Sequence, residues 1–221
     1  MPPKSAAYVP ALGFHWLTPF YDVVVGRTTR ERTFKRALIR QAAIGPDDAV
    51  LDLACGTGTL AVWIKDLQPA ARVTGVDGDD AVLARARANA SRRDVAIDFD
   101  QALSTQLPYP DACFDRVLSS LFFHHLTFDD KRRTAQELFR VLKPSAQLHV
   151  ADWGRPTDAL MRMLFLSIQL LDGFPNTRDN VQGKLPEVFR QAGFDAVTQT
   201  TTFSTIYGTM ALYRAVKPPA P

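Results

Sequence analysis

One segment near the start of the chain restricts its fold more than any other. Residues 49–53 form a short apolar run, residues 54–58 hold a turn with two glycines, and residues 59–67 have the pattern of a helix. A buried strand that passes through a glycine turn into a helix begins a βαβ unit. Gly56 and Gly58 let the backbone approach a ligand closely, and the first turn of the helix offers unpaired N–H groups. The segment therefore predicts a ligand site at the end of a parallel strand.

Strand and helix patterns alternate along most of the remaining chain. We expect further strands at 72–76, 95–99, 114–120 and 147–151, and helices at 79–91 and 127–142. The last part of the chain is expected to hold an apolar helix at 158–171, a loop at 172–183, a helix at 185–192, and strands at 194–202 and 205–216. Repeated βαβ units predict a doubly wound α/β sheet with helices on both faces, and such a sheet binds ligands at the carboxyl ends of its strands.

Composition excludes several classes of protein. Hydrophobic residues make up 46% of the chain and charged residues 22%, which is typical of a folded domain. A net charge of +3 is too small to drive nonspecific binding to nucleic acid. The two cysteines, Cys55 and Cys113, are too few for a disulfide scaffold or a four-cysteine zinc site. We expect neither a signal peptide nor a transmembrane segment, and a cytoplasmic location.

The glycine turn has two interpretations. Gly56, Gly58 and Ala61 fit the dinucleotide fingerprint, and Asp77 lies about 20 residues further on, where an acid would bind a ribose. These residues favour an NAD(P)-dependent oxidoreductase. Asp52, inside the strand, favours a different ligand, because a buried carboxylate would repel a pyrophosphate but suits the ammonium and sulfonium groups of S-adenosylmethionine. Asp52 could also serve only to hydrogen-bond the glycine turn.

Four segments in the same order support the second interpretation. Residues 51–58, 74–78, 107–117 and 137–144 resemble successive motifs of the class I S-adenosylmethionine-dependent methyltransferases, and the chain is similar to their UbiE-like group, also called type 11 or 25 domains. Residues 17–22 resemble the N-terminal segment of that group. The resemblance implies a Rossmann-like, mostly parallel seven-stranded sheet with an antiparallel last strand. It also implies in-line methyl transfer from S-adenosylmethionine to a small molecule, lipid-like or quinone-like, which leaves S-adenosylhomocysteine.

The resemblance also implies which residues bind the cofactor. They are Asp52, Ala54, Cys55, Gly56, Gly58, Asp77, Gly78, Leu103, Ser104 and Ser119. Among them, Asp77 holds the position of the acid that binds the ribose hydroxyls. Leu103 and Ser104 stand where the family usually has Asp-Ala. The backbone N–H of Ser104 could make the adenine contact in its place, and Asp98 and Asp100 are alternatives that we expect along the preceding strand.

Three side chains are candidates for proton chemistry. His124 and His125 follow the fourth expected strand, where an imidazole could accept a proton at neutral pH, and Tyr21 lies in the N-terminal segment. Alternatively, the histidines order their loop and Tyr21 is an aromatic plug. We expect no metal site, because adjacent histidines project in different directions and no acid cluster with ligand spacing accompanies them.

The chain is expected to form one domain. Residues 1–45 would be an N-terminal helical cover, and residues 46–221 the methyltransferase core, with a lid-like insertion at about 155–183. Basic residues at 27–36 allow peripheral membrane contact through the N-terminal segment, or else form a solvated helix face. A protein that binds S-adenosylmethionine without transferring its methyl group is a third reading.

Overall fold

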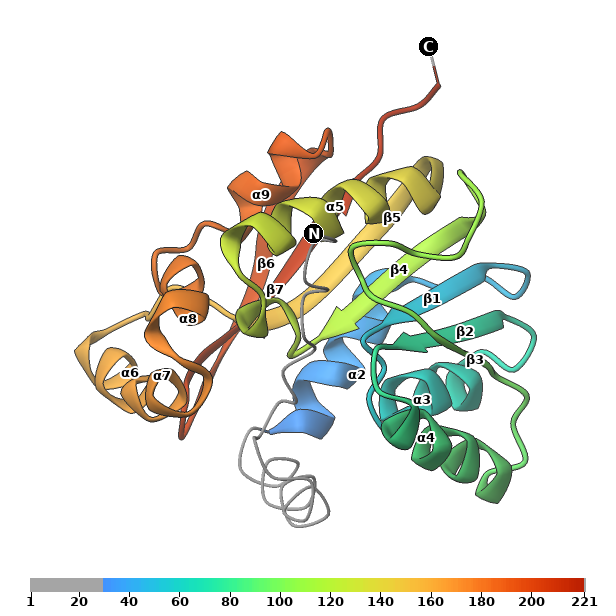
Figure 1. Cartoon of the computed structure of the whole chain (residues 1–221), viewed down its shortest axis with the longest axis horizontal. Coiled ribbons are helices and arrows are strands. Elements are labelled where there is room, and N and C mark those ends of the chain that lie inside the picture. The colour runs from blue at the N-terminus through green and yellow to red at the C-terminus, as the bar shows by residue number, and fades with distance from the viewer. Residues whose placement is uncertain (1–29, 221) are drawn as a thin grey trace, which may run out of the picture.

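The computed structural model describes residues 30–220, which hold a single seven-stranded sheet in the order β3-β2-β1-β4-β5-β7-β6 (Figure 1). The strands are β1 Ala49–Leu53, β2 Arg72–Asp77, β3 Asp98–Gln101, β4 Phe114–Ser120, β5 Leu142–Trp153, β6 Asp195–Thr205 and β7 Gly208–Val216. Strands β1 to β5 are parallel to one another, whereas β7 is antiparallel to both β5 and β6. The predicted doubly wound sheet with an antiparallel last strand is confirmed.

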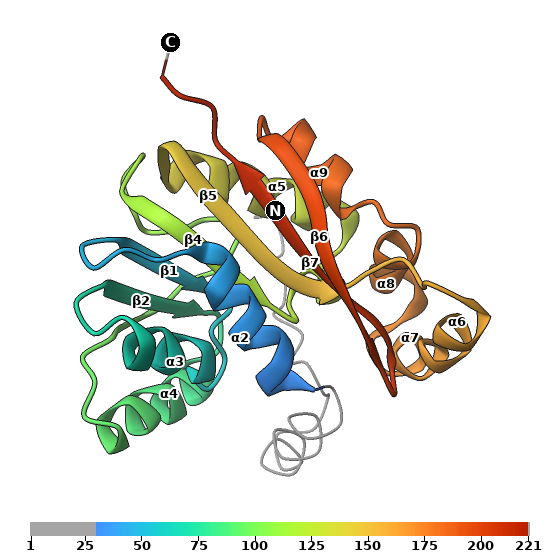
Figure 2. The ribbon, with the colours of Figure 1, turned by 180° about the vertical axis from the view of Figure 1, so that it is seen from behind.

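Helices cover both faces of the sheet (Figures 1 and 2). Helices α2 Glu31–Ala42 and α3 Thr59–Leu67 pack on one face, with α4 Asp80–Arg92 beside α3. Helices α5 Phe128–Val141 and α9 Leu185–Gln191 pack on the other face. The short helices α6 Ala159–Leu164, α7 Leu166–Asp172 and α8 Phe174–Val181 lie near the carboxyl end of β5 (Figure 1). A 3₁₀ turn, η2 Phe123–His125, follows β4.

The alternation of side chains along β1 places the most informative residue of the sequence. Val50 joins the apolar cluster that contains α2 and α3, whereas Leu51 and Leu53 join the cluster that contains α5 and α9. Because side chains point to opposite faces in turn, Asp52 shares the α3 face with Val50. Its carboxylate is therefore directed toward the helix that follows the glycine turn.

Several parts of the chain differ from the sequence expectation, among them β5, which begins at Leu142 and not at residue 147. Strand β3 begins at Asp98 rather than Val95, because the Val95 N–H donates to the carbonyl of Ala90 and closes the end of α4. The alternation at 95–99 instead reflects Val95 and Ile97 packing beside α4.

The helix expected at 158–171 is interrupted at Phe165, which is buried against Trp153 and separates α6 from α7. The loop expected at 172–183 contains helix α8. Its Gly173, Pro175 and Asn176 resemble a loop in sequence, but Pro175 lies in the first helical turn, where a missing N–H has no cost.

The parallel strands bring several loops to one edge of the sheet. The glycine turn follows β1, Asp77 ends β2, η2 follows β4, and Asp152 lies near the end of β5. In residues 30–220, no helix is long and apolar enough to cross a membrane.

Candidate functional site

The two glycines of the turn after β1 have different functions. Gly58, with φ +75°, begins α3, and a Cβ there would lie 3.1 Å from the Cβ of Ala86. Gly58 therefore allows α3 and α4 to pack closely. Gly56, with φ +55°, would place a Cβ in open space, with no atom within 4 Å among the described residues other than its neighbours in the chain. The turn thus presents bare backbone to an open region at Gly56, next to the N-terminus of α3. This is a cradle in which a ligand can approach the main chain.

Asp52 connects β1 to the start of α3. Its carboxylate is 1% exposed, and its Oδ2 accepts a hydrogen bond from the Ala61 N–H at 3.0 Å. Its Oδ1 is buried and accepts no hydrogen bond within residues 30–220. Burial raises the pKa of Asp52 to about 7, although the nearby charge of Lys35 opposes the rise. The hydrogen bond to Ala61 supports the alternative that Asp52 orders the turn, and the second oxygen retains the capacity to bind a cationic group.

Asp77 faces the same turn from β2. Its Oδ2 accepts from the Gly56 N–H at 2.9 Å, and its Oδ1 accepts from the Asp79 N–H at 3.1 Å. Each carboxylate oxygen has two lone pairs, so these two bonds leave the carboxylate with capacity to accept from a ligand hydroxyl. Burial raises the pKa of Asp77, and the backbone hydrogen bonds act against that rise. Gly78 follows, and its carbonyl accepts from the Gln101 side chain at 3.2 Å.

Other predicted cofactor residues lie around the turn. Ala54 has a left-handed backbone with φ 53°, and Cys55 is buried, with a thiol pKa that burial raises strongly. A thiol of this kind is unreactive, so Cys55 is a packing residue. Leu103 is 49% exposed in the loop after β3. The Ser104 hydroxyl hydrogen-bonds the hydroxyl of Thr134 in α5 at 2.8 Å.

Ser119 lies in β4, next to β1. Its side chain is fully buried, and its hydroxyl donates to the Leu53 carbonyl at 3.1 Å. This hydrogen bond therefore joins β4 to the end of β1, just before the glycine turn. Tyr21 and the other residues of segment 1–29 lie outside the described residues.

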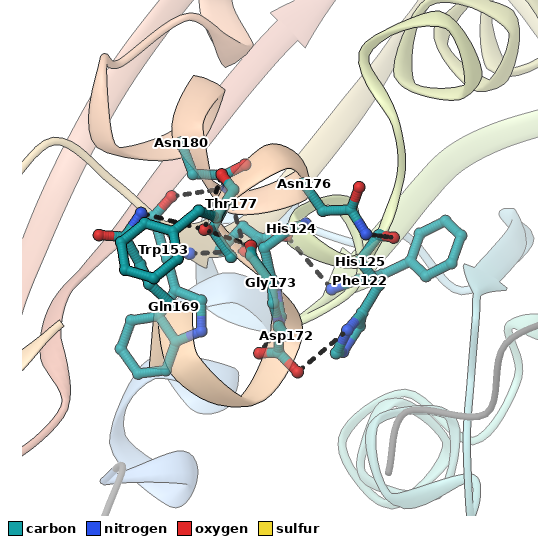
Figure 3. Close-up of polar contacts among 12 residues, drawn as sticks. Phe122, His124, His125, Trp153, Gln169, Asp172, Gly173, Asn176, Thr177 and Asn180 are labelled. Atoms are coloured by element: carbon teal, nitrogen blue, oxygen red, sulfur yellow. Dashed lines mark hydrogen bonds and ion pairs between the residues drawn. The ribbon is translucent and has the colours of Figure 1, made fainter. Parts of the chain in front are cut away.

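A polar cluster follows β4 and β5 at the same edge (Figure 3). His124 is buried, and its Nδ1 lies 2.7 Å from the Oδ1 of Asp152. The Asp152 carboxylate also accepts from the backbone N–H groups of Phe122, His124 and Trp153, at 3.2, 3.3 and 2.6 Å. Asn180 of α8 donates to the same carboxylate at 3.3 Å and to the Trp153 carbonyl at 2.9 Å. Asp152 thus connects η2, β5 and α8.

A second acid, Asp172, reaches the two histidines from the end of α7 (Figure 3). Its Oδ2 lies 3.6 Å from His124 Nε2, and its Oδ1 lies 3.6 Å from His125 Nδ1. The two imidazole rings have centroids 4.0 Å apart. The expectation that adjacent histidines would project in different directions is therefore wrong, because the 3₁₀ turn places both rings on one side.

The cluster shifts the pKa of each member. Burial acts to lower the pKa of His124, but the charge and hydrogen bond of Asp152 outweigh it and raise that pKa. Burial acts to raise the pKa of Asp152, but the charge and hydrogen bond of His124 and the backbone N–H of Trp153 outweigh it and lower that pKa. Burial and the charge of His124 lower the pKa of His125 to about 3, so its imidazole is neutral at pH 7.

The sequence analysis named both histidines but neither acid. Asp152 comes directly after an apolar strand, at the edge where ligands bind, and this position could have identified it. Asp172 ends an apolar helix before a glycine, and nothing in the sequence indicates that it reaches the histidines.

Sequence comparisons place the chain among methyltransferases. A family profile described as a methyltransferase domain matches residues 50–145. Demethylmenaquinone methyltransferases of Deinococcus radiodurans and Thermus thermophilus are 31% and 36% identical over 154 residues, which cover 69% of this chain. The matched segments span 63% of the Deinococcus protein and 69% of the Thermus protein, so this chain matches less than two thirds of the length of the Deinococcus protein. The ubiquinone/menaquinone biosynthesis C-methyltransferase UbiE of Pseudomonas putida is 30% identical over 99% of this chain and 92% of that protein.

Structural comparisons agree on the fold. A S-adenosylmethionine-dependent methyltransferase of Methanosarcina mazei matches 83% of this chain and 98% of its own, with a TM-score of 0.66 and 20% identity. The 4+2 cyclase SpnF matches 85% of this chain and 82% of its own, with a TM-score of 0.68 and 20% identity. One of these proteins is named a methyltransferase and the other a cyclase, so the structural likeness establishes the fold and not the reaction.

Asp52→Asn tests the charge of the buried carboxylate. The raised pKa means that ionised Asp52 destabilises the fold, so wild-type stability falls relative to the variant as pH rises from 3.8 toward 7. Between pH 4 and pH 8 we expect a relative loss of a few kcal/mol, at about 1.4 kcal/mol per pKa unit. Urea unfolding at both pH values measures it. Asp129→Asn, which removes an exposed carboxylate, is the control, and a difference for Asp52→Asn that does not change with pH would contradict the assignment.

Proposed function

The chain belongs to the UbiE-like class I S-adenosylmethionine-dependent methyltransferases, and we propose that it methylates a small, apolar, quinone-like molecule that carries a hydroxyl group. Bound at the glycine turn, S-adenosylmethionine supplies the methyl group on a sulfonium centre. The observation that carries the proposal is the open cradle at Gly56, flanked by the carboxylates of Asp52 and Asp77.

The residues around this cradle fit the polar groups of the cofactor. The remaining lone pairs of Asp77 suit the two ribose hydroxyls, because charge-assisted hydrogen bonds to a carboxylate are strong. The unpaired Oδ1 of Asp52 suits a cationic amino group. Leu103 offers an apolar side chain for the adenine, since it is 49% exposed on the loop after β3. The backbone N–H groups at the start of α3 suit a carboxylate.

Helices α6 to α8 give the proposed acceptor region its apolar character. Their large apolar side chains that are exposed are Leu160, Met163, Leu166, Leu170, Leu171 and Phe174. Exposed apolar side chains that gather on one part of a surface indicate binding to an apolar partner. We infer that this insertion, at about 155–183, covers the acceptor side of the site. This inference agrees with the quinone biosynthesis methyltransferases among the relatives of the chain.

The lining beside the acceptor is suited to orient a hydroxyl group. His125 has a neutral imidazole at pH 7 and a side chain that is 26% exposed, so it can hydrogen-bond a ligand hydroxyl. His124 is less accessible, since it lies buried between Asp152 and Asp172. In this proposal His125 orients the acceptor and His124 fixes the position of η2.

Cofactor choice is tested by calorimetric titration of the full-length chain. S-adenosylhomocysteine should bind with micromolar affinity, and NADH should not bind at the same concentrations. Asp77→Asn should weaken S-adenosylhomocysteine binding at least tenfold, because it replaces an anionic acceptor of charge-assisted bonds. Asp80→Asn, on the exposed first turn of α4, should leave the affinity unchanged. Tight binding of NADH, or equal affinities for the wild type and Asp77→Asn, would refute this assignment.

The acceptor class is tested by transfer of a labelled methyl group to a panel of phenols and quinols with and without a short prenyl chain. We expect transfer to a prenylated quinol. Leu171→Ser, at a side chain 64% exposed on α7, should raise the KM for that acceptor severalfold, because it removes apolar contact. Leu67→Ser is the matched control, at a side chain 60% exposed on α3. No transfer to any quinol, or equal effects of the two variants, would exclude this acceptor class.

A further inference from the structure

The His124, His125 and Asp172 cluster has the geometry of a metal centre. The ligand atoms of the three side chains all lie within 4.8 Å of one another. Both imidazoles lie 3.6 Å from a different oxygen of the same carboxylate. In a tetrahedral zinc site, ligand atoms at about 2.0–2.1 Å from the ion lie about 3.3 Å apart. The two 3.6 Å separations are close to this value, and the widest separation, within 4.8 Å, has to shorten by about 1 Å or more when an ion binds, which side-chain rotation can supply.

The distances from the two histidines to Asp172 are also longer than hydrogen bonds. A hydrogen bond between an imidazole nitrogen and a carboxylate oxygen spans about 2.7–3.2 Å. His124 makes such a bond on its other nitrogen, where Nδ1 lies 2.7 Å from Asp152. The contacts of His124 and His125 with Asp172 at 3.6 Å are longer than this range, so they are ion-pair distances and not hydrogen bonds.

Asp152 fixes the form of His124 that a metal needs. An imidazole that donates its Nδ1–H to a carboxylate carries its free lone pair on Nε2, and metal-bound histidines commonly make such a bond. The Nε2 of His124 faces Asp172. In that form His124 presents a lone pair to the Asp172 carboxylate, and a metal ion between the two groups would take the place of the proton that the raised pKa of His124 otherwise retains. The arrangement of carboxylate, histidine and second carboxylate therefore favours a cation at this position.

The surrounding helices hold the three side chains in place (Figure 3). Asn176 of α8 donates to the His125 carbonyl at 3.1 Å. Gly173, with φ +87°, turns the chain directly after Asp172, and its carbonyl accepts from the Thr177 hydroxyl at 2.8 Å. Because α8 is also attached to Asp152 through Asn180, the positions of the histidine pair and of Asp172 are coupled.

We propose that His124 Nε2, His125 Nδ1 and the Asp172 carboxylate form a site for a divalent transition metal ion of the zinc class. Two imidazoles and one carboxylate suit such an ion and disfavour calcium or magnesium, which prefer oxygen ligands. Zinc takes four ligands, so one position remains for water or for an acceptor oxygen. That last role rests on the proposed function, whereas the metal site does not. His125 is 26% exposed, which gives the site contact with solvent.

The test uses the full-length chain after treatment with a chelator. Competition with a chromophoric chelator should show one Zn²⁺ bound per chain. Asp172→Asn and His125→Gln should each weaken Zn²⁺ binding at least tenfold, because each replaces a proposed metal ligand with a neutral amide of similar volume. Co²⁺ in place of Zn²⁺ should give visible absorption bands that both variants lose. Cys113→Ser is the control for binding by the partly exposed thiol, and it should leave the affinity unchanged.

Titration with S-adenosylhomocysteine separates this site from the cofactor site. Both variants should bind it as the wild type does, which also shows that they are folded. If Asp172→Asn does not fold, His125→Gln alone decides the matter. Zinc binding without S-adenosylhomocysteine binding would retain the metal site and refute the proposed function. Zinc binding that is absent in the wild type, or equal in the wild type and the variants, would show that the cluster is structural only.

Discussion

The hydrogen bond from the Ala61 N–H to the buried carboxylate of Asp52 is the interaction on which the cofactor side of the structure depends. It attaches the start of α3 to the middle of β1, and the glycine turn between them must follow a sharp path. That path requires left-handed backbone at Ala54, Gly56 and Gly58. The burial of Asp52, which raises its pKa to about 7, is unfavourable for a charge in the absence of a ligand. A site that destabilises the fold in this way is typical of function rather than of packing.

A second buried acid, Asp152, holds the elements that follow β4 and β5 at the same edge of the sheet. The Asp152 carboxylate accepts hydrogen bonds from the His124 N–H in η2 and from the side-chain amide of Asn180, and it therefore connects η2 and α8 to the sheet. Lys131 of α5 contributes to the same attachment, since its ammonium group donates to the carbonyl of Asn176. Helix α8 is therefore anchored by polar contacts, while helices α6 to α8 also expose large apolar side chains. This division suits a segment that fixes a site and also contacts an apolar ligand.

Local signals predicted much of the fold and part of the site. The bounds of β1, α3 and β4 agree with the expectation, because each is a short apolar or periodic run with a clear boundary. Gly56 and Asp77 were named from their spacing, and the structure brings them into contact. The contact of Asp152 with His124 joins residues that are 28 positions apart, and such pairs depend on how β4 and β5 align. Helix α8 was missed because its turn-forming residues are stabilised by tertiary contacts with Asp152 and Lys131.

The proposed function depends most on binding of the cofactor at the ends of β1 and β2. Amide hydrogen exchange of the full-length chain, with and without S-adenosylhomocysteine, measures this directly. A ligand in the Gly56 cradle should slow exchange in peptides that contain residues 54–61 and 77–79, because it covers their N–H groups. Peptides from the middle of α9, on the other face, should not change. Slower exchange confined to α9 or to other segments away from the cradle would contradict the account.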